Sequence, residues 1–220
     1  MKVTDIGIRR RGLAALRFSP PLPEKIENAD YEGEKILVDR VILSRCNIKV
    51  GTVLEEDDIK QLVFVSECYR AKQRAIWYLS RGDNSEKGLY KKLCRNFSEK
   101  AAEFAVKQMA DKGYINDITY AERLIKKYDD KNVSARQAKA KLFEKSVPAN
   151  IVEEVLNGYV EGDGERAYNL ICEKYSKKVQ DEEERKKVFA ALLRKGFSFS
   201  DIKHAMDKMV KAEYDFDEEI

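Results

Sequence analysis

Residues 97–110 read FSEKAAEFAVKQMA, residues 147–160 read VPANIVEEVLNGYV, and residues 197–210 read FSFSDIKHAMDKMV. Apolar residues occupy the same five positions of each segment, spaced i, i+3, i+4, i+7 and i+8, which is one face of a helix. The fifteen positions are Ala102, Ala105, Val106, Met109, Ala110, Val152, Val155, Leu156, Tyr159, Val160, Ile202, Ala205, Met206, Met209 and Val210. Each segment opens on Phe or Val followed by Ser or Pro, and Ser and Pro are common at helix starts. Helices that recur every fifty residues indicate an internal repeat.

Two further helices precede each of these segments. In the second helix of each unit the matched apolar pairs are Leu89 and Leu93, Ala138 and Leu142, and Val188 and Leu192. Ser85 and Ser134 stand where an N-cap is expected. The pattern predicts a three-helix unit present three times, and such units bury their apolar faces by stacking on their neighbours.

The first 54 residues differ from the repeats. Two apolar-rich runs, residues 3–9 and 13–18, predict a β-hairpin, and residues 35–38 predict another strand. Asp39 is placed to cap a short helix over residues 40–46. No Pro or Gly interrupts residues 55–81, which predict one long helix or two in tandem.

These elements define the expected fold class. It is mainly α, with three tandem three-helix repeats forming an elongated, curved body, preceded by a small mixed α/β N-terminal domain. We expect the N-terminal domain at 1–54, the lead-in helix and first repeat at 55–115, the second repeat at 116–160 and the third at 161–212. Residues 213–220 hold five acids, and we expect them to form a disordered acidic tail.

Composition narrows the class of protein. Charged residues make up 37% of the 220 residues, and the longest apolar run is only six residues, Val188 to Leu193. A membrane span needs about 20 apolar residues, and the N-terminus lacks a signal-peptide pattern, so we expect no membrane association and a cytoplasmic location. Cys46, Cys68, Cys94 and Cys172 show no paired spacing, so we interpret them as reduced and mostly buried.

No catalytic, metal or cofactor site is predicted. The phosphate-binding loop pattern fails around Gly82 and Gly88, and Gly162-Asp163-Gly164 is interpreted as a linker between repeats. The one histidine, His204, falls beside an apolar stripe and is expected to be a partly exposed helix residue. Without a base in a pocket, no nucleophile or acid–base pair is assigned.

The informative chemistry is a basic excess in the first repeat. Residues 69–115 hold eleven basic and five acidic residues, whereas residues 161–220 hold twelve and fifteen. Lys87, Lys91 and Arg95 are spaced i, i+4 and i+8, which predicts a stripe facing away from Leu89 and Leu93. The partner or DNA-binding candidates are Arg70, Arg74, Arg81, Lys87, Lys91, Lys92 and Arg95. The pattern equally fits an ordinary solvated face, and Arg9-Arg10-Arg11 is either a contact arm or a charged turn.

Two segments resemble the RecX family. The first is Ala75-Ile76-Trp77-Tyr78-Leu79-Ser80-Arg81 followed by Ser85-Glu86-Lys87-Gly88-Leu89, and the second is Lys112-Gly113-Tyr114-Ile115-Asn116-Asp117 followed by Tyr120-Ala121. The motif residues given a structural role are Ser85, Leu89, Leu93, Gly113, Tyr114, Asp117 and Ala121. Gly113 suits a left-handed helix cap and Asp117 suits the N-cap of the next helix.

The resemblance implies a non-enzymatic regulator of the RecA recombinase. Such a protein would bind in the groove of the RecA–DNA filament and modulate, most often inhibit, its ATPase, its strand exchange and its role in the SOS response. We expect a monomer without cofactor that contacts the RecA filament and, weakly, single- or double-stranded DNA. The alternative is a helix-turn-helix-like DNA-binding module that acts independently of RecA.

Overall fold

The structure is a computed structural model that describes residues 1–179 and 181–217, with side chains described up to Met209. It divides into two compact units, Met1–Ile115 and Asn116–Ile220. None of the described helices combines the length and the apolar character that crossing a bilayer requires.

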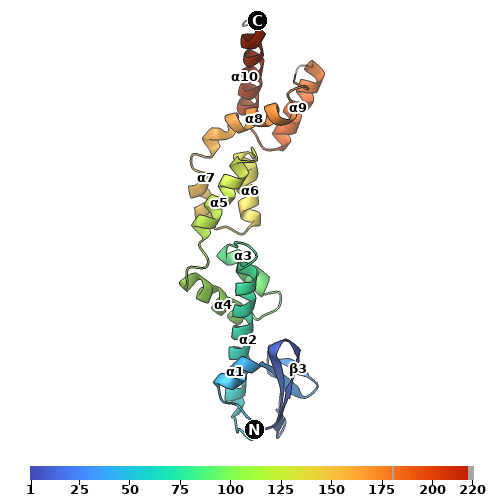
Figure 1. The fold of residues 1–220 in the computed structure, drawn as a ribbon, viewed down its shortest axis with the longest axis vertical. Helices are drawn as coiled ribbons and strands as arrows, with labels where there is room; N and C mark the ends of the chain where they lie inside the picture. The colour runs from blue at the N-terminus through green and yellow to red at the C-terminus, as the bar shows by residue number, and fades with distance from the viewer. Residues whose placement is uncertain (180, 218–220) are drawn as a thin grey trace. The chain divides into compact units, whose positions relative to one another are not determined.

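The first unit begins with a four-stranded antiparallel sheet in the order β1-β2-β4-β3. Figure 1 shows this sheet in blue, next to α1 and α2. Its elements are β1 (Lys2–Ile8), a 3-10 turn η1 (Arg10–Gly12), β2 (Leu13–Ser19), β3 (Asp30–Glu32), β4 (Lys35–Asp39) and α1 (Arg40–Arg45). The predicted hairpin, third strand and short helix are therefore confirmed, and Asp39 caps α1 by accepting a hydrogen bond from the Val41 amide at 2.8 Å. Strand β3 was missed because it has only three residues.

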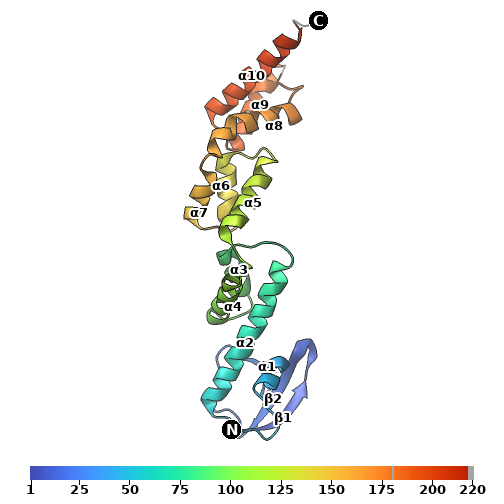
Figure 2. The same ribbon diagram turned by 60° about the vertical axis from the view of Figure 1, so that its left-hand side comes forward.

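One helix joins the sheet to the first repeat. Helix α2 (Glu56–Leu79) is continuous, which decides between the one-helix and two-helix alternatives (Figure 2). Its first half packs Ile59, Leu62 and Val63 into the core of the sheet, and its second half packs Ala71 and Ala75 into the core of the repeat. The small alanines let α2 and α4 approach closely. The repeat is completed by α3 (Glu86–Leu93) and α4 (Glu99–Asp111).

The second unit holds the other two repeats, each with its own core. The second repeat comprises α5 (Asp117–Asp129), α6 (Ala135–Glu144) and α7 (Ala149–Leu156), followed by η2 (Val160–Gly162). The third comprises α8 (Asp163–Lys174), α9 (Glu182–Arg194) and α10 (Phe199–Asp217). The predicted triplication of a three-helix unit is confirmed.

Three details correct the sequence analysis. Helix α7 ends at Leu156, ahead of Gly158 with its φ of +80°, so Val160 lies outside the helix and is 58% exposed rather than part of the apolar face. Helix α10 continues to Asp217, because no Pro or Gly interrupts it, so residues 213–217 are helical rather than a disordered tail. The rest of the predicted tail, residues 218–220, lies outside the described residues.

The cysteines are all free thiols, as expected, but only Cys68 is buried. Cys46 is exposed at the end of α1, and Cys94 and Cys172 are half-buried. Burial raises the pKa of the Cys68 thiol from 9.0 to about 11, which keeps it protonated and unreactive at neutral pH.

Candidate functional site

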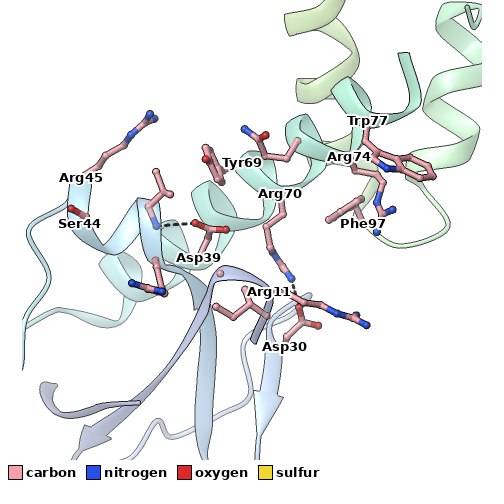
Figure 3. Close-up of a pocket in the computed structure, with 15 residues that line it drawn as sticks. Arg11, Asp30, Asp39, Ser44, Arg45, Tyr69, Arg70, Arg74, Trp77 and Phe97 are labelled. Carbon is pink, nitrogen blue, oxygen red and sulfur yellow. Dashed lines mark hydrogen bonds and ion pairs between the residues drawn. The ribbon is translucent and has the colours of Figure 1, made fainter. Parts of the chain in front are cut away.

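A groove of about 1110 Å³ opens in the first unit between the end of the sheet, α1 and the middle of α2 (Figure 3). We call it the arginine groove. Every basic residue that lines it is an arginine: Arg11, Arg40, Arg45, Arg70 and Arg74. Three aromatic residues complete it, namely Tyr69 and Trp77 from α2 and Phe97 from the turn before α4.

Hydrogen bonds fix the walls of the arginine groove relative to each other. Asp39, the N-cap of α1, donates its amide to the Ser66 hydroxyl of α2 at 2.8 Å, and both residues are buried. Arg70 of α2 donates to the Asp30 carboxylate of β3 at 2.6 Å, as Figure 3 shows. The Arg70 Nε is buried without a hydrogen-bond partner. The groove is therefore a built feature of one folded unit.

The other four arginines of the groove remain exposed. Among the described residues, they form no ion pair with a carboxylate, and Asp39 is already engaged as a cap. Aromatic rings hold two of the guanidinium groups, since Arg45 lies 5.7 Å from the centroid of Tyr69 and Arg74 lies 5.3 Å from that of Trp77. Such contacts position a cation while leaving its N–H donors available.

The predicted binding residues do not all lie together. Arg70 and Arg74 line the groove, and Arg81 stacks on Trp77 at 4.2 Å. Lys92 donates a hydrogen bond to Asn84, and its ammonium lies 5.4 Å from the Tyr78 ring centroid.

The predicted basic stripe is wrong in its geometry. Helix α3 ends at Leu93 with Cys94 as its C-cap, so Arg95 lies in the following turn and not on the helix. Lys87 and Lys91 lie on α3, and both are exposed, as is Arg95. The helix is too short to carry three positions spaced over nine residues, although the three cations remain on the surface of one repeat.

The motif residues mainly build the repeats. Ser85 caps α3 by accepting from the Gly88 amide, and Leu89 and Leu93 are fully buried. Ala121 of α5 is likewise fully buried, whereas Tyr114 is 62% exposed.

Gly113 forms the predicted left-handed cap, with a φ of +71°. The Gly113 amide donates a hydrogen bond to the Ala110 carbonyl, and the Tyr114 amide donates one to the Met109 carbonyl. This pair of bonds is a Schellman motif. The predicted cap at Asp117 is wrong, because Asn116 is the N-cap and accepts from the Thr119 amide at 3.0 Å. Asp117 is the first residue of α5, where its charge suits the helix dipole.

A second polar cluster lies at the junction of the second and third repeats. The Asp163 carboxylate accepts from the Ala135 amide at 2.9 Å and pairs with Arg166 at 2.8 Å. Arg166 also reaches Asp129 at 3.0 Å and stacks on the Tyr159 ring at 3.6 Å. The Gly162-Asp163-Gly164 segment is thus part of a buried junction and the start of α8, which corrects its interpretation as a linker.

Sequence reasoning missed most of the arginine groove. No local pattern marks Arg40, Arg45 or Tyr69, and Phe97 shows only the pattern of a repeated helix. The fold brings these residues together from separate elements. Trp77 offered a usable signal, since the chain's one tryptophan falls on the polar side of its helix and is 42% exposed. Arg11 was noted only as part of a hairpin turn that could be a contact arm.

Known proteins are similar to this chain in its third repeat and over most of its length. Residues 161–206 match the third three-helix domain of RecX. The chain is 25% identical over 186 residues to "Regulatory protein RecX" of Clostridioides difficile strain 630, covering 82% of this chain and 87% of that protein. It is 29% identical over 161 residues to the protein of that name from Caldanaerobacter subterraneus subsp. tengcongensis, covering 73% and 81%.

Solved structures share the fold. A crystal structure of regulatory protein RecX aligns over 94% of this chain and 98% of its own, with a TM-score of 0.63 and 21% identity. RecX from Lactobacillus salivarius aligns over 66% of this chain and 97% of its own, with a TM-score of 0.58 and 23% identity.

Proposed function

We propose that the chain is a member of the RecX family of regulatory proteins and that it regulates the RecA recombinase by binding along the groove of the RecA filament on DNA. In this proposal the protein lowers ATP hydrolysis and strand exchange by RecA and has no enzymatic activity of its own. The observation that supports the proposal is the similarity to proteins named "Regulatory protein RecX", which covers 82% and 90% of this chain and 87% and 72% of two such proteins.

The architecture supports a mechanism based on several modest contacts. The chain holds three separate helical cores, so different repeats can contact different protomers of a filament. Linked contacts raise the overall affinity through effective concentration without any single strong site. A ligand that binds one filament state more tightly than another shifts the filament toward that state, which is sufficient for inhibition.

The exposed cations of the first repeat are the proposed contact to the filament. Lys87, Lys91 and Arg95 lie outside the core, so replacing them removes little packing. Changing all three to Glu alters the local charge by six units and turns attraction to an acidic groove or to phosphates into repulsion. We therefore expect the triple variant to keep its helical content and melting temperature and to lose inhibition.

The test is DNA-dependent ATP hydrolysis by RecA at fixed salt, with wild-type protein, the triple variant and a control. The control changes the exposed Lys126, Lys127 and Lys131 of the second repeat to Glu, which makes the same change in net charge. Equal inhibition by wild type and the K87E/K91E/R95E variant would assign the contact to other residues. A wild-type protein that neither binds RecA filaments nor changes their ATPase, but binds duplex DNA alone, would favour the helix-turn-helix alternative.

A further inference from the structure

The arginine groove lies outside the basic cluster on α3, and its chemistry differs from that of the rest of the surface. The chain contains 27 lysines and 15 arginines, yet no lysine lines the groove. Arginine offers a planar fork of donors that binds phosphate in a bidentate manner, and its guanidinium also stacks on flat rings. Selection of arginine at this place indicates a partner with phosphates, flat rings or both.

The charge of the arginine groove is not neutralised by the fold. Of its two aspartates, Asp30 pairs with Arg70 and Asp39 caps α1. The remaining guanidinium groups come from η1, α1 and α2, and Figure 3 labels Arg11, Arg45 and Arg74, one on each of these elements. An anionic chain lying in the groove can therefore be contacted from more than one side.

The aromatic residues make a polynucleotide the better fit. Trp77 keeps 42% of its surface exposed although Arg74 and Arg81 lie against it and Tyr78 meets it edge-on at 5.1 Å. A positively charged groove with exposed rings is the arrangement that binds single strands, because unpaired bases stack while their phosphates meet the cations. In a duplex the bases already stack on each other and cannot reach such rings.

We propose that the arginine groove binds a single-stranded nucleic acid, with phosphates on Arg11, Arg40, Arg45 and Arg74 and a base stacked in the Trp77 cluster. This binding needs no recombinase. Four phosphate contacts on a single strand predict a slope of log K against log salt of about −3.

The first measurement uses the wild-type protein alone. Trp77 is the one tryptophan of the chain, so quenching of intrinsic fluorescence on titration with a fifteen-nucleotide oligo-dT reports directly on the groove. We expect quenching that saturates and weakens with salt at the predicted slope. Binding of the labelled oligonucleotide without any change in tryptophan emission would place the strand elsewhere and overturn the proposal.

Variants then test the two kinds of contact. R40A/R45A, on α1, should flatten the salt slope by about 1.4, because two of the four phosphate contacts are lost. Trp77→Ala should weaken oligonucleotide binding, followed by anisotropy, about 5- to 150-fold. The control K127A/K131A makes the same change in net charge in the other unit, and it should leave affinity and slope unchanged.

Competition identifies the class of partner. A duplex of the same sequence and a poly-glutamate peptide of equal charge are added to the protein–oligonucleotide complex. We expect both to compete at least tenfold more weakly than unlabelled oligo-dT. A duplex that binds more tightly, or a peptide that competes equally well, would overturn the proposal. Because RecA is absent throughout, the result is separate from the test of the proposed function.

Discussion

Gly196→Ala tests how tightly the second and third repeats pack. Gly196 follows the C-cap of α9 with a φ of +91°, and its amide and the next one complete a Schellman motif. A Cβ at this position would lie 2.8 Å from Ser134 Oγ and 3.2 Å from Arg136 Cβ, both in the second repeat. Ser134 Oγ itself donates to the Lys195 carbonyl at 2.6 Å, so it is not free to move away.

The magnitude has two parts. A left-handed backbone costs a residue with a Cβ about 1–2 kcal/mol more than glycine. Inserting a methyl into a packed contact costs about 1–3 kcal/mol more. We therefore expect Gly196→Ala to lower the free energy of unfolding of the second unit by about 2–5 kcal/mol.

Gly158→Ala separates these two parts. Gly158 lies in the same unit with a φ of +80°, but its Cβ would meet nothing within 4 Å. It should carry only the backbone cost, so the excess of Gly196→Ala over Gly158→Ala measures the contact between repeats. An excess of 1 kcal/mol corresponds to about 4–8 °C in melting temperature for a unit of this size.

Urea unfolding followed by circular dichroism is the assay, with the change in midpoint read at constant slope. Trp77 lies in the other unit, so its fluorescence transition serves as an internal control that Gly196→Ala should leave in place. Equal destabilisation by the two variants would refute the reasoning, because it would show that the α9 turn does not press on Ser134 and Arg136 in solution.

Three further outcomes follow from the second unit. Leu142→Ala should lower the free energy of unfolding by about 2–5 kcal/mol because Leu142 is fully buried. The exposed control Lys126→Ala should change it by no more than about 0.5 kcal/mol in the same urea assay. Equal effects would mean that Leu142 is not a core residue. Arg166→Ala should lower the free energy of unfolding by about 3–5 kcal/mol, because the Arg166 side chain is 7% exposed and the buried Asp163 carboxylate loses its partner. Lys208→Ala breaks an exposed ion pair with Glu165 and should lower it by no more than about 1 kcal/mol. A larger effect of Lys208→Ala would contradict the buried junction. Burial raises the pKa of Tyr159 from 10.0 to about 12, so the stability that its neutral form contributes is complete below pH 10 and is lost as the pH rises through about 12. Tyr159→Phe should reduce this alkaline loss of stability in urea titrations at several pH values. An unchanged pH profile would assign the loss to other groups.

The repeats were predictable because helical periodicity is a local signal. Buried positions such as Leu89, Leu142 and Leu192 recur at a fixed place in each unit, and the cap at Ser134 is set by residues within one turn. Departures arise where one residue changes a helix end. Gly158 ends α7 early, and Val160 therefore leaves the apolar face although its spacing matches.

Contacts between elements were not predictable by the same means. Asp163 looked like a loop acid between two glycines, yet it pairs with Arg166 of the same helix, and it accepts a hydrogen bond from the Ala135 amide because the third repeat packs against the second. Arg166 lies only three residues away, but nothing in the local sequence signals the bond from the Ala135 amide. That bond is set by tertiary structure, which periodicity does not contain.

The arginine groove also arises from tertiary structure, which brings together side chains from separate elements. Arg11, Arg45 and Arg74 lie in a turn, a short helix and a long helix, and each alone is an ordinary exposed cation. What makes them a site is the continuous α2, which extends from the N-terminal sheet to Trp77 and so places an exposed ring in the same groove as cations from η1 and α1. Two separate helices in this region would have allowed sheet and repeat to move apart, and no fixed groove would follow. The continuity of α2 is therefore the feature on which the inferred binding of a single strand depends.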